Sequence, residues 1–299
     1  MAHSLRKIVT EIIHPIQKVH NFANRKDYIM TARIKPPDLA EIGRKAKMSR
    51  EEVNGFLGLV KRSMEPLVKR ISVTENKTVR YYAVERRGLG VLTTAYGKFW
   101  QYNFSIDDQW EKYSVIVKAE IDKEHLVPVF AKTDQFVLRT DSGCETGQLL
   151  GDLTCECREQ LHLALKTIQE VGEGMIISIP RQDGRGMGLT FKLATLWLQD
   201  ALGVNTVESA TLLAPGGVID VRTYSGVICI LKFFGIPENC KINLATNNPE
   251  KANVFAENGY TVVEFTPVVI EPNHHTEVHL IAKMDLLGHK GLIKKGKEP

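Results

Sequence analysis

Several features that would define other protein classes are absent from this sequence. No uninterrupted apolar run approaches the ~18 residues that a membrane span requires, and the N-terminal stretch that is apolar at helical spacing carries charges throughout. There is no internal repeat, and no low-complexity segment apart from a basic tail at residues 290–299. These absences argue against a membrane protein and against a repeat protein, and they make the cytoplasm the default location.

Cysteine is also scarce, and its distribution excludes another class. Only five cysteines occur among 299 residues, and three of them lie within the fourteen positions from 144 to 157. A secreted disulfide scaffold has an even, dispersed set, so metal binding is the better interpretation. With 43% hydrophobic and 25% charged residues, the chain has enough apolar surface for a core without disulfide bonds.

The charge distribution indicates separately built parts. Residues 1–87 carry a net charge of +10 and the remainder carries −6. The length of 299 residues also exceeds the ~100–200 residues typical of one domain. We therefore expect a basic N-terminal domain at residues 1–87, a larger domain at residues 88–289 and a short basic tail at residues 290–299.

The basic segment has the pattern of a small, mainly helical domain. Apolar residues recur at helical spacing over residues 8–19, and a short helical run covers residues 39–46. A tight turn then leads to a helix opened by a capping box at Ser49. Two β-like runs follow, at residues 67–73 and 79–84. This order predicts a winged helix-turn-helix-like domain.

The larger part has a different pattern, which starts with β-structure and then alternates. Residues 90–104, 113–120 and 126–139 are predicted to be strands. Beyond the cysteines, helical and strand patterns alternate, which predicts a mixed α/β (α+β) domain. The expected helices are 158–170, 188–201, 226–234 and 249–258, and the expected strands are 174–179, 241–245 and 261–265.

The spacing of the three clustered cysteines predicts a metal site. Cys144 lies eleven positions before Cys155, and Cys157 follows in Thr-Cys-Glu-Cys-Arg. Thiolates suit Zn²⁺, and a site with three protein ligands keeps a position for water, whose pKa the metal lowers to about 7. Two alternatives remain from spacing alone: a closed tetrahedral site with His162 as fourth ligand, and unligated buried cysteines.

Several motifs, in their order along the chain, carry a family resemblance. Over residues 88–289 the sequence resembles the GTP cyclohydrolase II family of riboflavin biosynthesis. The motifs are Arg139-Thr-Asp-Ser-Gly-Cys144-Glu-Thr-Gly147, Gly151-Asp-Leu-Thr-Cys155-Glu-Cys157-Arg-Glu-Gln160, Arg181-Gln-Asp-Gly-Arg-Gly-Met-Gly-Leu189, Leu198-Gln-Asp200, Asn205-Thr-Val-Glu208, Asp220-Val-Arg222-Thr-Tyr224 and Leu244-Ala-Thr-Asn-Asn-Pro-Glu-Lys251.

The resemblance implies a homodimeric hydrolase that uses one Zn²⁺ per chain, held by Cys144, Cys155 and Cys157, together with Mg²⁺. Such an enzyme opens the imidazole ring of GTP at C8 and releases pyrophosphate. The resemblance assigns Arg222 as the nucleophile at the α-phosphorus and Asp220 as the acceptor of its proton. Because a guanidinium has a pKa above about 12, the alternative is that Arg222 only stabilises charge on the phosphates.

The nucleotide contacts are implied in the same way. The turn from Asp183 to Gly188 is rich in glycine and leads into a helix, which is typical of a phosphate cradle. Arg185 and Lys251 are the expected charge partners of the triphosphate. The positions that match the family's nucleotide contacts are Arg139, Thr140, Asp141, Ser142, Gly143, Gln160, Asp183, Gly184, Arg185, Thr206, Thr246 and Lys251.

The sequence departs from the family pattern around the expected pocket. Leu196 stands where the family usually has a tyrosine, Gly143 replaces a usual glutamate, and Gln148 replaces a usual aspartate. Leucine can neither donate a hydrogen bond nor carry a proton. The hydrolysis could therefore stop at a formylamino product, without formate release, or the enzyme could act on another base, as in UTP.

A function of a different class also remains open. The basic residues 1–87 could bind nucleic acid, with Arg50, Lys61 and Arg62 near phosphates, and the larger domain would then sense a nucleotide. The simpler alternative is a helical dimerisation or docking module with a solvated basic face. Because Asp220, Arg222 and all three cysteines are present, we favour the enzyme: binding alone needs no open metal site.

Overall fold

The computed structural model of the protein describes residues 35–108, 112–131, 136–290 and 292. The helix expected at residues 8–19 and nearly all of the basic tail lie outside these residues. The chain divides into two compact units, Met1–Phe56 and Leu57–Pro299.

The expected pair of helices is present: the first unit contains α2 (Leu39–Ala46) and the beginning of α3 (Arg50–Ser63), and α3 ends within the second unit. Helix α2 begins after Asp38, whose carboxylate accepts a hydrogen bond from the Ala40 backbone at 2.9 Å. Helix α3 begins after Ser49, and the predicted capping box forms because Ser49 and Glu52 bond each other's backbone N–H at 3.1 and 2.6 Å. Val53 on α3 is buried.

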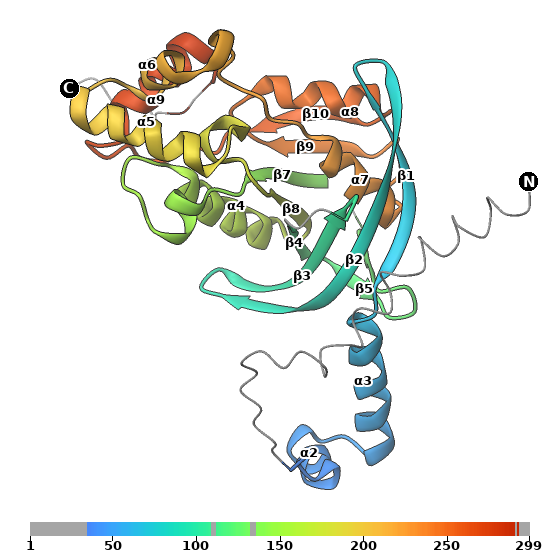
Figure 1. Ribbon diagram of the computed structural model, residues 1–299. Coiled ribbons are helices and arrows are strands. Elements are labelled where there is room, and N and C mark those ends of the chain that lie inside the picture. The colour runs from blue at the N-terminus through green and yellow to red at the C-terminus, as the bar shows by residue number, and fades with distance from the viewer. Residues whose placement is uncertain (1–34, 109–111, 132–135, 291, 293–299) are drawn as a thin grey trace, which may run out of the picture. The chain divides into compact units, whose positions relative to one another are not determined.

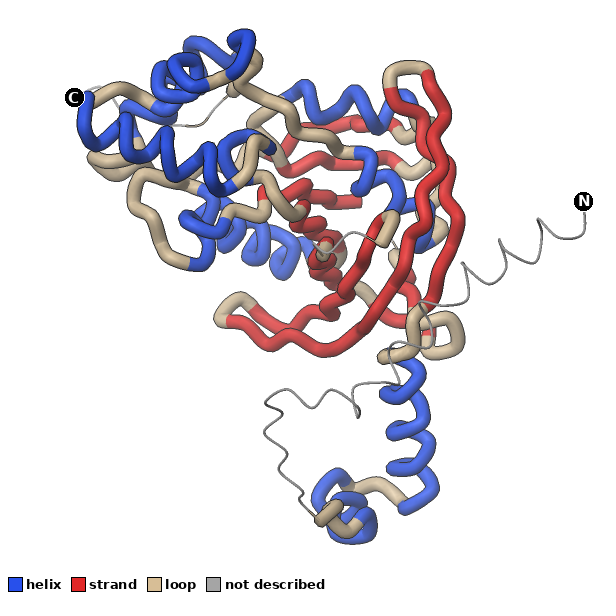
Figure 2. Tube along the Cα trace, in the orientation of Figure 1, coloured by secondary structure: helices blue, strands red, loops and turns tan. Residues whose placement is uncertain are grey.

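The second unit is built on an eight-stranded sheet (Figures 1 and 2). The strand order is β1-β2-β3-β4-β8-β7-β9-β10. Neighbouring strands from β1 to β8 are antiparallel, whereas β8, β7, β9 and β10 are mutually parallel. Strands β5 (Glu120–Asp122) and β6 (Val127–Val129) form a separate hairpin. The eight strands are β1 (Leu67–Glu75), β2 (Thr78–Thr94), β3 (Gly97–Ile106), β4 (Tyr113–Lys118), β7 (Phe136–Ser142), β8 (Gly174–Ile179), β9 (Lys241–Ala245) and β10 (Thr261–Thr266).

The expected domain boundary near residue 87 falls inside a continuous strand. Strand β2 pairs with β1 on one side and with β3 on the other, with a register shift between Arg86 and Gly88. The two β-like runs that the sequence pattern assigned to a wing therefore belong to the large sheet. A hairpin has the same alternating pattern in either setting, and only its partner strand tells the two apart.

Helices cover both faces of the sheet, and the alternation of side chains decides which residues they meet. In β7, Val137 packs with Ile168 of α4 (Cys157–Val171) on one face. Its neighbour Leu138 lies in the main core on the other face, with α7 (Ser225–Phe234) and Phe255 of α8 (Asn253–Glu257). This arrangement confirms the mixed α/β class, since a sheet buried on both faces needs helices on both.

Three further helices gather beyond the carboxyl ends of the parallel strands (Figure 1). They are α5 (Leu189–Leu202), α6 (Thr206–Leu213) and α9 (Glu277–Leu287). Short turns follow β7, β8 and β9 at Glu145–Leu149, Asp183–Gly186 and Pro249–Ala252, and another covers Pro215–Gly217. Parallel strands end at one edge of a sheet, so these turns converge there. None of the helices in the described residues has the length and apolar character of a membrane span.

Candidate active site

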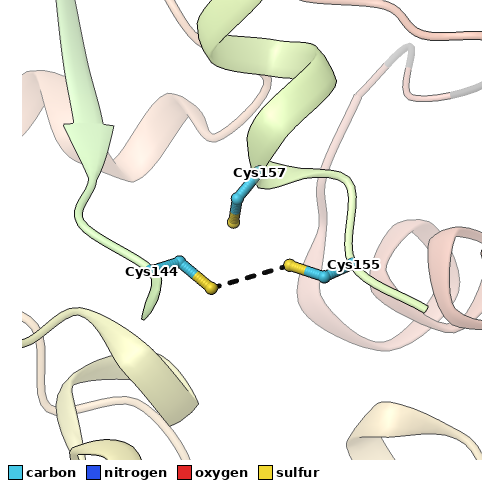
Figure 3. A group of neighbouring side chains, drawn as sticks. All are labelled: Cys144, Cys155 and Cys157. Carbon is cyan, nitrogen blue, oxygen red and sulfur yellow. Dashed lines mark hydrogen bonds between the residues drawn. The ribbon is translucent and has the colours of Figure 1, made fainter. Parts of the chain in front are cut away.

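The three clustered cysteines converge at the carboxyl end of β7. Cys144 follows that strand, Cys155 lies in the loop that precedes α4, and Cys157 is the first residue of α4. Figure 3 shows their side chains pointing toward one another. The Cys144 and Cys155 sulfurs are 3.7 Å apart, and all three sulfurs lie within 4.8 Å of one another.

The surroundings of the sulfurs fit a thiophilic cation such as zinc. A Cβ atom on Gly147 would lie 2.6 Å from the Cys155 sulfur, so only glycine leaves room beside the cluster. The pKa of Cys144 lies below the usual thiol range because the other two thiols donate to it, while the pKa of Cys155 is raised to about 12 and that of Cys157 is also raised. A second thiolate would be repelled by the first, and a bound divalent cation would relieve this repulsion.

The same geometry bears on the closed-site alternative. Among the described residues, the group that could hold a metal consists of the three cysteines alone. His162 instead packs its ring against Tyr96, with centroids 5.3 Å apart. Three protein ligands with no fourth are typical of catalytic zinc sites.

A lysine that the sequence patterns did not single out also faces the cluster. Lys192 comes from α5, and its Nζ lies 3.0 Å from the Cys144 sulfur. Its side chain is only 12% exposed, and its pKa is raised because the nearby thiol groups outweigh the effect of burial. The cluster therefore has a positive charge beside it, supplied from a different element.

One cavity gathers most of the expected site residues around this cluster. Its wall includes the three cysteines and the following residues predicted from sequence: Arg139, Ser142, Gln160, Asp183, Gly184, Arg185, Thr206, Arg222, Thr246 and Lys251. Thr140 and Asp141 are buried behind this wall, and Asp220 contacts Arg222 without lining the cavity. Gly143 lines a neighbouring cavity, which shares Cys144 and Asp183 with the first.

Two cations lie on the cavity wall beside β7, Arg139 from the strand itself and Lys251 from the turn after β9. Arg139 donates from Nε and Nη2 to the Asp141 carboxylate at 3.3 and 3.2 Å, and both side chains are buried. The Lys251 Nζ donates to the Thr140 carbonyl at 3.1 Å. Burial and the nearby Arg139 and Arg222 lower the pKa of Lys251 to about 7. An anion in the cavity would restore the charge of this lysine.

The glycine-rich turn after β8 presents a third cation. Arg185 adopts a left-handed backbone with φ of 58°, which is uncommon outside glycine and marks local strain. Its guanidinium donates to the carbonyl and the hydroxyl of Thr206 at 3.2 and 3.3 Å. The Thr206 backbone N–H in turn donates to Nδ1 of His279 at 3.1 Å. Burial lowers the pKa of His279, and because Nδ1 accepts this hydrogen bond, the neutral ring carries its proton on Nε2.

Asp220 and Arg222 form a closely bonded pair on the segment between α6 and α7. The Arg222 Nε contacts both carboxylate oxygens, at 2.9 and 3.1 Å, and Nη2 also donates to the carboxylate. Burial alone would lower the pKa of Arg222, but the hydrogen bonds that it donates to Asp220 raise it. A Cβ atom on Gly186 would lie 3.1 Å from the Arg222 backbone nitrogen, so the turn approaches closely because it has no side chain there.

Helix α9 and the residues after it contribute groups that the sequence patterns did not assign. His279, Lys283 and His289 all line the cavity. Lys283 donates to Glu156, which lies between the two adjacent cysteines, at 2.5 Å. Burial and the neighbouring cations lower the pKa of His289 to about 4. The only sequence signal for these residues is that they fall within residues 88–289, which resemble the family.

The departures from the family pattern lie at or near the cavity. Leu196 lines it, one helical turn after Lys192. The two aromatic residues nearest in sequence to the expected pocket residues do not line it, since Trp197 is 77% exposed and Tyr224 packs against Lys251 with its ring 5.3 Å from Nζ. No side chain in these positions therefore replaces the expected tyrosine.

The chain is similar to proteins of a known family. A profile of the family described as GTP cyclohydrolase II matches residues 86–267. A GTP cyclohydrolase-2 from Picrophilus torridus is 36% identical over 198 residues, which cover 66% of this chain and 94% of that protein. A GTP cyclohydrolase-2 from Shewanella amazonensis is 35% identical over 215 residues, covering 71% of this chain and 93% of the relative.

A longer relative shows similarity over a part of its length only. The riboflavin biosynthesis protein RibBA from Phocaeicola vulgatus is 34% identical over 198 residues, covering 66% of this chain and 45% of that protein. The family profile begins at residue 86, inside β2 (Thr78–Thr94). Strand β1 and helices α2 and α3 therefore precede the matched region.

Proposed function

The chain belongs to the GTP cyclohydrolase II family, and on that premise we propose that it is a zinc-dependent GTP cyclohydrolase of riboflavin biosynthesis. It hydrolyses the guanine imidazole ring of GTP and releases pyrophosphate. The observation that supports this proposal is a single cavity whose wall carries the three-cysteine cluster and the cations Arg185, Arg222 and Lys251, with Asp220 bonded to Arg222. In this proposal the cysteine cluster serves the hydrolysis of the ring, and Asp220 and Arg222 serve the cleavage of the triphosphate.

The zinc site in this proposal consists of Cys144, Cys155 and Cys157. Zinc bound there supplies a water that is acidic enough to be deprotonated near pH 7. The protein's own contribution is to hold the three sulfurs within 4.8 Å and to place Lys192 beside them. Mg²⁺ accompanies the triphosphate, as it does for most enzymes that bind these phosphates.

Arg222 and Asp220 act on the phosphates. As a guanidinium nitrogen of Arg222 forms a bond to the α-phosphorus, the bond from that phosphorus to the pyrophosphate oxygen breaks, and Asp220 takes the proton from the nitrogen. The raised pKa of Arg222 means that its proton leaves only as the new bond forms, so an acceptor must already be in place. The bonds between Asp220 and Arg222 satisfy this requirement.

The remaining nucleotide contacts are proposed at the residues implied by the family resemblance. Arg139, Gln160, Asp183, Arg185 and Lys251 line the cavity. Ser142, Gly184, Thr206 and Thr246 line it as well. Thr140, Asp141 and Gly143 are proposed to act from behind or beside this wall, through the backbone or through a neighbouring side chain.

The reaction products test the proposal directly. Purified zinc-loaded protein is incubated with GTP and Mg²⁺, and then with UTP, while pyrophosphate, formate and the mass of the nucleotide product are followed. We expect pyrophosphate from GTP. If neither triphosphate releases pyrophosphate, the proposed activity is wrong, and if UTP alone reacts, the base assignment is wrong. Formate measures whether Leu196 stops the reaction at a formylamino product.

A Cys155→Ser variant separates the two halves of the reaction. Loss of one thiolate removes the zinc, so ring opening is expected to stop while pyrophosphate release continues, because that step uses Asp220 and Arg222. Zinc content measured by elemental analysis accompanies the assay. Equal loss of both products in a folded variant would show that one group serves both steps.

We also propose that the protein is a cytoplasmic homodimer. The outer faces of α5 and α6 expose large apolar side chains: Leu193 at 52%, Trp197 at 77%, Leu202 at 62% and Leu212 at 65%. An exposed apolar patch of this kind typically marks a protein–protein interface. Sedimentation equilibrium of the full chain tests the dimer, and Trp197→Glu is expected to weaken it.

The second candidate function, nucleic-acid binding by residues 1–87, is supported by the net charge of +10 and by the tight α2–α3 helix pair. The two strands that would form a wing belong to the large sheet. Nucleic-acid binding would therefore depend on the helices alone. Full-length protein that shifts duplex DNA with a steep dependence on salt would support it, whereas no shift at low salt would remove it.

A further inference from the structure

Gln148 occupies a bridging position that neither the metal site nor the nucleotide contacts explain. It lies in the π-helical turn that follows Cys144, and its Nε2 donates to Oδ2 of Asp141 at 2.7 Å. Its Oε1 accepts from the backbone N–H of Cys144 at 3.4 Å. One amide thus contacts a proposed metal ligand and a carboxylate that is buried behind the cavity wall.

The carboxylate that Gln148 holds is itself the support of Arg139. Oδ1 of Asp141 accepts from the Arg139 Nε and Nη2, and Asp141 is only 1% exposed. Arg139 also donates to the Ala245 carbonyl at 3.3 Å and to Oε1 of Gln160 at 3.1 Å. A continuous chain of hydrogen bonds therefore connects the backbone of Cys144, through Gln148 and Asp141, to the guanidinium of Arg139 on the cavity wall.

We propose that Gln148 is a positioning residue, which fixes the Asp141–Arg139 pair against the metal loop so that Arg139 faces the bound nucleotide in one orientation. The inference rests on the proposed function, since it takes Arg139 as a nucleotide contact. Gln148 touches neither substrate nor metal in this role. It acts through Asp141.

The chemistry of the pair requires an amide at position 148. Asp141 offers only acceptor oxygens, so its partner must be a donor, while the Cys144 N–H needs an acceptor. A carboxylate at 148, like the aspartate usual in the resembling family, would place two acceptors against each other. Without the amide, Oδ2 of Asp141 retains only the Ser178 hydroxyl at 3.4 Å. A buried carboxylate with too few donors rotates or shifts, and Arg139 follows it.

A purely structural role for this side chain is distinguishable from positioning. The backbone N–H of Gln148 already bonds the Cys144 carbonyl at 2.9 Å, and this bond closes the turn whatever the side chain is. Replacing the side chain should therefore leave the turn and its zinc in place. What changes is the affinity for nucleotide.

The experiment uses the full zinc-loaded chain and a GTP analogue whose bridge between the α- and β-phosphorus resists cleavage. Gln148→Met keeps the volume and removes both polar contacts. We expect it to raise the dissociation constant of the GTP analogue by roughly 10- to 100-fold. It should also raise KM more than it lowers kcat and leave zinc content unchanged. Leu149→Gln is the matched control, since Leu149 is the next residue and 76% exposed. It should bind like wild type.

Rescue by exchange provides the sharper comparison. Gln148→Glu sets two carboxylates against each other and should weaken binding more than Gln148→Met. Adding Asp141→Asn restores one donor facing one acceptor, so the double variant should bind more tightly than Gln148→Glu alone. Wild-type affinity in Gln148→Met, or a double variant that is no better than Gln148→Glu, would overturn the inference.

The proposed function can fail separately. If wild-type protein neither binds nor converts GTP, the proposed function is wrong. The interaction between Gln148 and Asp141 is then tested by measuring the free energy of unfolding in denaturant. Wild type, Gln148→Glu, Asp141→Asn and the double variant form a thermodynamic cycle. A coupled effect supports the link, and additive effects overturn it.

Discussion

Lys192 Nζ lies 3.0 Å from the sulfur of Cys144, although the two residues are 48 positions apart in the chain. Three thiolates and one divalent cation would leave the site with an excess negative charge, and Lys192 offsets it at a distance where the hydrogen bond is charge-assisted. The lysine also contacts Asp152 at 3.9 Å, so its ammonium is held from two sides. Helix α5 thus takes part in the metal site without supplying a ligand.

We predict that Lys192→Met weakens zinc binding. A hydrogen bond to a charged group contributes about 1.5–3 kcal/mol, so the zinc dissociation constant should rise by roughly 10- to 100-fold. Competition with a chromophoric chelator measures it. Lys166→Met, which removes an exposed lysine of α4, is the control. Equal zinc affinity in both variants would contradict the role of Lys192.

A second prediction concerns Asp220. Asp220→Asn keeps the size of the side chain and removes the proton acceptor, so pyrophosphate release should fall by about 10²- to 10⁴-fold. Zinc content should not change. Because Asp220 is 37% exposed, the free energy of unfolding should change by less than about 1 kcal/mol. Glu170→Gln, at an exposed position on α4, is the control. Retention of activity within a few-fold would show that another group accepts the proton.

Local spacing is sufficient to predict the cysteine cluster but not its surroundings. Cys155 and Cys157 are two residues apart, and β7 delivers Cys144 to the same edge, so a short-range pattern carries the metal site. Lys192 reaches the cluster from α5, and His279 reaches the cavity from α9; the positions of both helices depend on tertiary packing. A lysine on an amphipathic helix has the same pattern whether it faces solvent or a thiolate.

For the fold too, local sequence patterns predict single elements but not how those elements pair. Strands β8 and β9 and helices α4 and α5 match the expected ranges to within one residue at most ends, because their apolar periodicity is strong. The domain boundary near residue 87 is predicted from the difference in net charge between the two parts of the chain. Charged residues indicate which surfaces are solvated, but they do not indicate that β2 pairs with both β1 and β3.

A third prediction follows from the pKa of Lys251, which burial lowers to about 7. Between about pH 7 and pH 10 the unfolded chain binds a proton that the folded, nucleotide-free protein does not. The free energy of unfolding should therefore rise with pH through this window. A bound triphosphate restores the charge, so binding at pH 8 should take up close to one proton.

Calorimetry in two buffers of different ionisation enthalpy measures this proton uptake. Lys251→Arg keeps the positive charge at all accessible pH values. Triphosphate binding to this variant should therefore take up about one proton fewer than binding to wild type. If wild type and Lys251→Arg take up the same number, Lys251 is already charged in the free protein.

The last prediction concerns Leu196, which lines the cavity one helical turn after Lys192. Leucine offers no hydrogen bond to a reacting group, and neither Trp197 nor Tyr224 lines the cavity in its place. We therefore expect the wild-type product from GTP to retain the formyl group, and Leu196→Tyr to release more formate per pyrophosphate. Mass spectrometry of the nucleotide product measures both. Leu196→Phe adds the ring without the hydroxyl and should behave like wild type. Equal formate from the Phe and Tyr variants would show that the hydroxyl is not the missing group.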